Sequence, residues 1–530
     1  MTRRKKRWLV ALSLIAVVGV GAAVSLYYMA RRLAANFDPM VREEAVQYLR
    51  ARFHCDVQLR ALHVHLPKLS TLALLLQHEK GARVRVDGEG LSMRLATAPA
   101  GSPPLFTMRR FGFALDLNTL RAPKKIVDSV FIDGLEINVP PRQKRPDLQT
   151  SASSPEHGAG RANVLIKAVK ILNASLVLLP RDTARRPMQF QIADLRLTSV
   201  GADSPMRYEA TLAIPKPPGD VHSQGTFGPW EADDPGSTQL AGTYTFSNAN
   251  LGIFNGIAGI LNSTGRFDGT LGAVHATGEA RVPDFRLKMT GHPVPLWTRF
   301  DCLVDGTNGN TVLQPVHARL GSTAFTTTGA VIKHEDQAHR SIDLKVEMPD
   351  GDMRDLLRLA TKHPPFMEGR LNLRSTIAIP PLTGKVKEKL DLDGTFELDD
   401  AHFLQSHIQQ QLDQLSRKGQ GQPGNQSIGD VLSNMGGSFR LDNQVMTFRA
   451  LSFAVPGADV DLTGSYDMDR DIIDFHGTLK LRAKVSETQT GWKRWALKPI
   501  DPFFAKNGAG TFLRIKVDGS SKQPHFGLDH

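Results

Sequence analysis

Residues Gly437–Leu481 read GSFRLDNQVMTFRALSFAVPGADVDLTGSYDMDRDIIDFHGTLKL, and this stretch decides the fold class. Apolar side chains alternate with polar ones in it, as Leu479 and Leu481 do on either side of Lys480. Period-two alternation is typical of β-strands that have one apolar face and one wet face. The sequence therefore predicts a mainly β protein built from antiparallel sheet. The same alternation recurs at Phe111–Leu117, Phe190–Leu197 and Leu513–Val517.

A loose five-residue motif recurs within and beyond this stretch. It consists of Gly, a small or polar residue, an aromatic or aliphatic residue, a polar residue, and a final aliphatic or aromatic residue. Its copies begin at Gly242, Gly369, Gly394, Gly437, Gly464 and Gly477. Several copies are a few tens of residues apart, which is the spacing of repeat architectures. Ordinary hairpins also restart strands after glycine turns, so both interpretations stay open, although the frequent Thr, Ser or Arg at the second position favours a repetitive sheet.

Short helices are predicted to interrupt the sheet. Residues 38–52 carry an apolar stripe that includes Met40, Val46 and Tyr48, and Pro39 fits the first helical position. Similar patterns predict helices at residues 251–261, at residues 352–362, which precede two prolines, and at residues 403–418. Residues 142–161 are rich in Ser, Pro, Gly and charge and poor in apolar side chains, so they predict a linker.

The composition of the 530 residues is that of a folded protein. Hydrophobic residues make up 41% and charged residues 22%, which argues against wholesale disorder. The 46 glycines and 32 prolines indicate many turns. Cys55 and Cys302 are too few for a disulfide framework or a zinc module. Two buried thiols are favoured over a bridge between them.

The N-terminal segment predicts a membrane anchor. Residues Trp8–Met29 read WLVALSLIAVVGVGAAVSLYYM and carry no charge. At about 1.5 Å per residue, a helix of this length covers a hydrocarbon core of about 30 Å. Aromatic rings at both ends suit the two interfaces. The predicted anchor residues are Trp8, Leu9, Leu12, Ile15, Val18, Leu26, Tyr27 and Tyr28.

Basic residues before the anchor set its orientation. By the positive-inside rule, they keep the N-terminus in the cytoplasm and send the rest of the chain across. A cleaved signal peptide is the alternative, but its apolar region is usually only about 7–15 residues long. The net charge of +12 fits this topology and anionic lipid surfaces, and no nucleic-acid-binding pattern accompanies it. The orienting residues are Arg3, Arg4, Lys5, Lys6 and Arg7.

The sequence contains no recognisable catalytic motif. It lacks G-x-S-x-G, H-E-x-x-H, a P-loop and a dinucleotide fingerprint. His63 and His65 would share one face of a strand, but no third metal ligand with suggestive spacing accompanies them. Carboxylates at residues 231–234 and 467–471 fall in apparent turns, where Asp bonds to local backbone. We therefore expect a protein that is not an enzyme, with no catalytic, cofactor-binding or metal-ligating residue.

The order of these features resembles the AsmA family of envelope proteins. A basic N-terminus and a membrane helix are followed by a short helix and a strand, in the passage ARFHCDVQLRALHVHLP (Ala51–Pro67). The stretch VFIDGLEINVPPR (Val130–Arg142) is similar to the family's strand before a linker. The segment Gly508–Asp529 is similar to its C-terminal region, where a Gly-turn strand meets a G-x-x-x-x-P-x-F tail. The resemblance covers most of the chain.

The resemblance implies a single-pass protein of the bacterial inner membrane, with its bulk in the periplasm as an elongated, curved sheet around an apolar groove. It implies a role in phospholipid transport or in outer-membrane assembly and lipid homeostasis. The implied partners are the inner membrane, a glycerophospholipid and outer-membrane assembly proteins. A membrane-tethered interaction scaffold is the alternative, and an anchored hydrolase is a less favoured one. Candidate groove-lining residues are Leu195, Leu197, Leu479, Leu481, Leu513 and Ile515.

The predicted segments follow from the anchor, the linker and the resemblance. They are a basic cytoplasmic tail (1–7), the transmembrane helix (8–29), an α+β region (30–141), the linker (142–161), a β-rich repeat region (162–350) and a β-rich C-terminal region with helices (351–530). Alternating strands would line an open groove, but they would equally form a closed sandwich. The sequence leaves that choice open.

Overall fold

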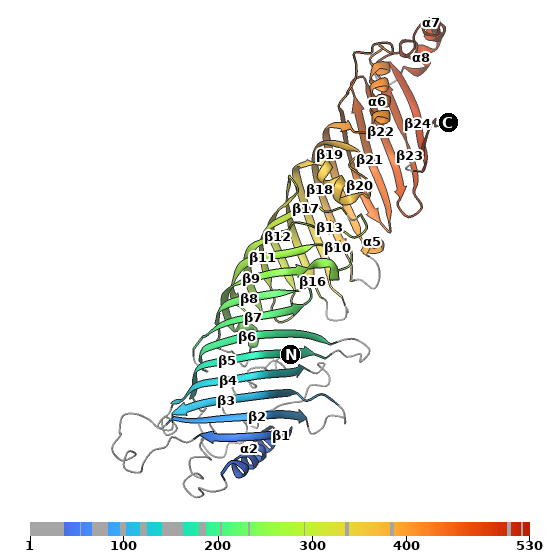
Figure 1. Ribbon diagram of the computed structural model, residues 1–530. Coiled ribbons are helices and arrows are strands. Elements are labelled where there is room, and N and C mark those ends of the chain that lie inside the picture. Colours follow the sequence, from blue (N-terminus) through green and yellow to red (C-terminus); the bar gives the residue numbers. More distant parts are fainter. Residues whose placement is uncertain are drawn as a thin grey trace. The chain divides into compact units, whose positions relative to one another are not determined.

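The computed structural model of this chain consists mainly of β-strands with a few short helices, which confirms the predicted class (Figure 1). The structure describes residues 37–53, 55–65, 83–95, 102–116, 124–139, 163–179, 187–201, 204–229, 231, 234–290, 292–333, 339–381, 386–505, 510–520 and 523–529. Within these ranges, no helix is both long and apolar enough to span a membrane. The predicted anchor (8–29) and linker (142–161) lie outside the described residues.

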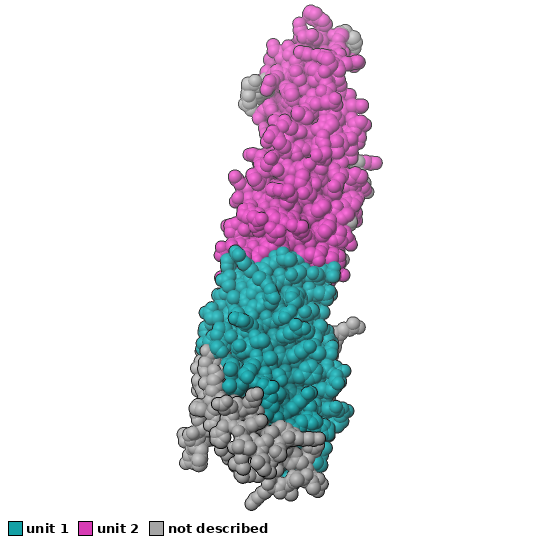
Figure 2. Space-filling model, turned by 60° about the vertical axis from the view of Figure 1, so that its left-hand side comes forward, with its two compact units in different colours: residues 1–249, 263–276, 305–307 teal, residues 250–262, 277–304, 308–530 magenta. Residues whose placement is uncertain are grey.

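The chain divides into two compact units, coloured teal and magenta in Figure 2. Unit 1 comprises residues 1–249, 263–276 and 305–307, and unit 2 comprises residues 250–262, 277–304 and 308–530. Strands β11 (Ile260–Thr270) and β12 (Ala273–Val282) are divided between the units.

Unit 1 contains helix α2 (Phe37–Phe53) and strands that pair in sequence order. The helix packs against β1 (Cys55–His65). The buried core of the unit includes Val86, Leu115 and Ile132, each at most 1% exposed. The remaining elements are β2 (Arg83–Leu95), β3 (Phe106–Asp116), β4 (Lys124–Val139), β5 (Asn163–Leu178), β6 (Met188–Val200), β7 (Met206–Pro215), β8 (Pro218–Phe227), η3 (Pro235–Ser237) and β9 (Gln239–Asn250).

Strands β4 and β5 pair in parallel, although the sequence predicts antiparallel sheet. The other pairs from β1 to β9 are antiparallel. Parallel neighbours need a crossover connection of about a dozen residues or more. Residues 140–162, which include the predicted linker, separate the two strands and are long enough for that crossover.

Unit 2 is an antiparallel meander whose strands pair in sequence order from β14 to β25. A separate two-stranded ladder joins β10 (Ile257–Ala258) to β13 (Arg286–Leu287). The long strands are β14 (Leu296–Val304), β15 (Thr311–Leu320), β16 (Thr323–Ile332), β17 (Ser341–Asp352), β18 (Met367–Ile379), β19 (Asp391–Phe403), β20 (Ser433–Asp442), β21 (Val445–Val455), β22 (Ala458–Asp467), β23 (Ile472–Leu481), β24 (Thr511–Ser520) and β25 (Gln523–Leu528).

Short helices connect some of these strands. Helices α4 (Met353–Ala360) and α6 (Ser406–Gly419) follow β17 and β19, and a run of short helical turns follows β23. Because β17, β19 and β23 run in the same direction, the connections that follow them lie at the same ends of the strands. We call this side of the sheet, where the strands end, its helix-bearing edge. The other helical elements are η4 (Leu251–Ile253), α5 (Val386–Lys389), η5 (Val485–Thr488), α7 (Trp492–Leu497), η6 (Lys498–Ile500) and α8 (Asp501–Phe504).

Three of the four predicted helices are confirmed as α2, α4 and α6. Within α2, Val46 is buried as predicted, whereas Met40 and Tyr48 are exposed. The helix predicted at residues 251–261 is wrong, because only the single turn η4 forms before β10 and β11. Gly256 and Gly259 have positive φ angles of 91° and 138°, which a right-handed helix cannot include.

The glycines of the recurring motif lie inside strands, so the interpretation as strand-starting turns is wrong for them. In β19, Gly394 shares a face with the apolar Phe396 and Leu398. A Cβ on Gly394 would lie 3.0 Å from the ring of Phe439 and closer still to the carbonyl oxygen of Arg374 on the neighbouring strand. The glycine therefore lets neighbouring strands and rings approach on the apolar side, as glycine kinks do in curved sheets.

Candidate functional site

The strands of unit 2 align mostly apolar residues and glycines into continuous rows. Residues paired across antiparallel strands share a face of the sheet, so the register of the strand pairs traces each row from strand to strand. The leucine row is Met348, Leu373, Phe396, Gly437, Leu451, Leu462, Gly477 and Ile515. The aromatic row lies two residues from the leucine row on each strand, except on β21, where a bulge makes the spacing three. Its members are Val346, Ser375, Gly394, Phe439, Phe448, Gly464, Phe475 and Val517.

A third row runs beside the leucine row toward the edge that bears α4 and α6. This helix-side row is Gly351, Leu371, Leu398, Met435, Phe453, Val460, Leu479 and Leu513. The three rows together define the apolar face of unit 2, which crosses strands β17 to β24. Aromatic rings strengthen it, because Phe396 packs 6.3 Å from Phe439 and Phe448 packs 5.7 Å from Phe475, measured between ring centroids.

Helices cover the apolar face at one edge. Leu357 of α4 packs with Leu371 and Leu398, which are 2% and 1% exposed. Leu415 of α6 packs on a second buried cluster that includes Val455 and Leu481. Away from that edge most side chains of the leucine and aromatic rows, Phe439 and Phe448 among them, are only half-buried. The face is thus neither a sealed core nor a fully wet surface.

Polar bonds hold α6 at that edge. Gln409 and Asp413 are buried on the helix face toward the sheet. The Gln409 amide donates to Asp413 at 3.1 Å and to the Val431 carbonyl at 2.9 Å, and the Val431 N–H donates to Asp413 at 3.1 Å. These bonds fix the helix against the segment before β20.

The six predicted groove-lining residues fall in different settings. Leu513 and Ile515 are half-buried on the apolar face, and Leu479 pairs directly with Leu513. Leu481 is 6% exposed within the α6 cluster. The other two lie in unit 1, where Leu197 is 5% exposed in the core and Leu195 packs against it. Of the six, only Ile515 therefore belongs to the half-open leucine row, whereas Leu479 and Leu513 belong to the helix-side row and Leu479 packs against the α6 cluster.

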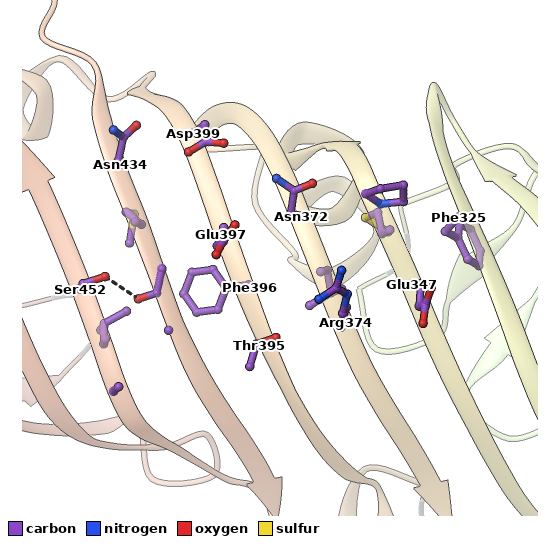
Figure 3. Close-up of a pocket in the computed structure, with 18 of the residues that line it drawn as sticks. Phe325, Glu347, Asn372, Arg374, Thr395, Phe396, Glu397, Asp399, Asn434 and Ser452 are labelled. Carbon is purple, nitrogen blue, oxygen red and sulfur yellow. Dashed lines mark hydrogen bonds between the residues drawn. The ribbon is translucent and has the colours of Figure 1, made fainter.

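The opposite face of the same sheet bears a hollow of about 1330 Å³ (Figure 3). On most strands its lining is a run of three residues with an apolar one in the middle, such as Asn372, Leu373 and Arg374. Successive side chains point to opposite faces, and Leu373 packs against the buried cluster under α4. The hollow therefore lies on the polar face, where Glu347, Arg374, Thr395 and Glu397 come from neighbouring strands.

The hollow carries charges of both signs. Arg319 and Arg374 lie among the carboxylates of Glu347, Glu397, Asp399 and Asp461. One of its two histidines, His476, bonds to Asp529 at 2.9 Å, and this hydrogen bond raises the pKa of the imidazole. The sequence reasoning missed the hollow, because an exposed polar residue in a strand gives no signal of concavity.

The carboxylate of Asp133 in β4 of unit 1 is buried, at 3% exposed, and holds several hydrogen bonds. It accepts from Asn173 at 2.8 Å, from Arg110 at 2.8 Å and from Arg109 at 3.2 Å. These partners lower its pKa, with the Asn173 hydrogen bond as the largest cause. Since both oxygens are engaged by β3 and β5, Asp133 locks the parallel pair to its neighbour and offers no free oxygen for acid–base chemistry.

The other residues that the sequence suggested for chemistry are the turn carboxylates, the two cysteines and possible metal ligands. Asp467 accepts from the backbone N–H groups of Asp469 and Arg470, each at 3.0 Å, which is the turn bonding expected from the sequence. Cys55 and Cys302 are both buried thiols and not a disulfide, and burial raises the pKa of each. Among the described residues, no group of three or more His, Cys, Asp or Glu side chains could hold a metal ion.

The comparisons with known proteins name no relative. No family model, no curated protein and no solved structure matches this chain. The resemblance to the AsmA family therefore rests on the sequence pattern alone.

Proposed function

We propose that this protein binds lipid acyl chains along the apolar face of unit 2, as a non-enzymatic envelope protein for phospholipid transport or outer-membrane assembly. One observation carries the proposal: the leucine and aromatic rows stay half-exposed over consecutive strands, while helices cover only one edge. An apolar face that stays partly exposed over several strands is typical of a binding surface.

The dimensions and energetics support an acyl chain as ligand. Neighbouring strands are about 4.8 Å apart, so a row across eight strands spans roughly 34 Å, more than one leaflet of a hydrocarbon core of about 30 Å. Each CH₂ group removed from water contributes about 0.8 kcal/mol. A chain lying along a row would therefore gain affinity from each strand that it crosses.

The proposal places the protein in the bacterial inner membrane through residues 8–29, with the described residues in the periplasm. This part rests on the uncharged apolar run and the basic residues before it. A glycerophospholipid is the proposed ligand, because its two acyl chains can lie along the rows of the apolar face while its polar headgroup stays in water.

A second candidate function is an interaction scaffold. The observation that favours it is the polar hollow of about 1330 Å³, whose mixed charges suit a polar partner and not an acyl chain. In this alternative, the apolar face would have no lipid ligand and the hollow would be the functional surface.

Lipid extraction followed by mass spectrometry tests the first proposal. Residues 34–530 are purified without detergent, and phospholipid is quantified per chain. Phe448→Asp places a charge in the aromatic row and should remove most of the lipid. Thr447→Asp, its neighbour on the exposed face of β21, is the matched control and should retain it.

Circular dichroism shows whether both variants keep the wild-type sheet. Wild-type protein that is folded and free of lipid contradicts acyl-chain binding and favours the scaffold. Equal lipid content in the two variants contradicts the assignment of the ligand to this face.

A further inference from the structure

The segment between β23 and β24 bears the most exposed large hydrophobic side chain of the described residues. Trp495 in α7 is 72% exposed. The side chains of Lys493 and Arg494 beside it are also exposed, as is Lys498 in η6. The ammonium group of Lys498 lies 4.1 Å from the centroid of the Trp495 ring. We call Lys493, Arg494, Trp495 and Lys498 the aromatic–basic tip.

The charge around the tip is one-sided. Residues 482–505 contain five basic side chains and two acidic ones, a net charge of +3. Of the two acids, Asp501 is only 9% exposed, and Glu487 accepts from the Lys484 backbone at 3.0 Å. The surface that the tip presents to a partner is therefore cationic around one indole ring.

Hydrogen bonds between Asp501 and Ser486 hold the segment that carries the aromatic–basic tip. Asp501 accepts from the backbone N–H of Ser486 at 2.8 Å and from its hydroxyl at 2.7 Å. Burial alone would raise the pKa of Asp501, but the Ser486 bonds and the charges of Lys484 and Lys498 together lower it. Helix α8 also packs on β24. Figure 1 shows α7 and α8 beyond the ends of β23 and β24.

We propose that the aromatic–basic tip docks unit 2 onto an anionic lipid surface. Indole rings settle at the interface between headgroups and acyl chains, and Lys and Arg side chains are attracted to anionic headgroups. An exposed Trp beside several basic side chains combines the attraction of the indole ring to the interface with the attraction of the cations to headgroups. A cationic patch that binds only nucleic acid gains nothing from an apolar ring of this kind. This surface is distinct from the acyl-chain face and does not depend on it.

A vesicle-binding experiment tests the proposal on the full chain. The protein is held in nanodiscs of phosphatidylcholine, so that its apolar N-terminal segment is embedded in lipid. The nanodiscs are mixed with vesicles of equal parts phosphatidylcholine and phosphatidylglycerol. Co-flotation measures affinity at several salt concentrations. The wild type should bind these vesicles, more weakly at high salt, and should not bind vesicles of phosphatidylcholine alone.

Two variants separate the contributions of charge and ring. Lys493→Glu, Arg494→Glu and Lys498→Glu combined should weaken binding at least about 100-fold, since each basic residue near an anionic surface contributes about fivefold. Trp495→Ser should weaken binding with an unchanged salt dependence. The combined control Lys345→Glu, Lys389→Glu and Arg440→Glu changes net charge equally at exposed positions elsewhere in unit 2 and should bind like the wild type.

Equal binding by the tip variant and the wild type overturns the proposal, as does an equal loss in the control. Wild-type binding to neutral vesicles that matches binding to anionic ones also overturns it. The variant Phe448→Asp should dock normally, so failure of the acyl-chain proposal and failure of the tip proposal give different results.

Discussion

At the scale of single residues, buried polar side chains are the positions with least freedom to change. Asp133 illustrates this, because its two oxygens accept hydrogen bonds from Asn173 and two arginines while its side chain is almost wholly buried. The arginines keep more than half of their own surface in water. Their attraction is therefore screened, and the hydrogen bonds to a buried carboxylate make the main contribution.

We expect Asp133→Asn to lower the free energy of unfolding by about 2 kcal/mol, as for loss of hydrogen bonds to a charged group. The lowered pKa of Asp133 sets the pH dependence. Its stabilisation is complete above the unfolded-state pKa of about 3.9 and is lost as pH falls through the lower folded-state pKa. Urea unfolding at a series of pH values measures this. The difference between wild type and variant should shrink below about pH 4, and Asp56→Asn at an exposed position should show little change.

At the scale of elements, the period-two alternation predicts the strands and their apolar sides correctly. It could not predict the parallel pair β4–β5, because pairing direction depends on the connection and not on the strand itself. It also could not separate a motif glycine inside a strand from a turn glycine, because close approach of a neighbouring strand leaves no trace in a single sequence. The helix predicted at residues 251–261 failed for a visible reason, the glycines at 256 and 259.

Helix α6 gives a prediction at this scale, since its face toward the sheet is partly polar. Asp413→Ala would leave the Val431 N–H and the Gln409 amide without their shared acceptor in a buried site. We expect a loss of about 2 kcal/mol in unfolding free energy, measured by chemical denaturation. Gln414→Ala, on the exposed face of the same helix, should change stability by no more than about 0.5 kcal/mol. A similar loss in both variants would contradict the role of the buried network.

At the scale of the whole molecule, the paired strands of each unit are mostly neighbours in sequence. Such a meander has mainly local contacts, and each strand is stabilised chiefly by the two beside it. The sequence predicted the apolar alternation of the candidate site. It could not predict which part stays half-open, because that depends on where α4 and α6 lie.

Hydrogen exchange followed by mass spectrometry should therefore show graded protection. Amides of β4 and β5, which flank the Asp133 network, should exchange slowest. Amides of β25 should exchange fastest, because this six-residue strand is mostly exposed and Phe526 and Leu528 keep 68% and 58% of their surface in water. Uniform protection across these strands would contradict nearest-neighbour stabilisation.

The register of the three rows also bears on how such a chain changes in length over evolution. Each hairpin of the meander contributes one residue per strand to every row, with the same face inward. Duplication or loss of a whole hairpin leaves the three rows continuous across the remaining strands. It lengthens or shortens each row by about 10 Å. Insertion of a single residue that no β-bulge takes up turns the remainder of its strand over. Homologous chains should accordingly differ by pairs of strands.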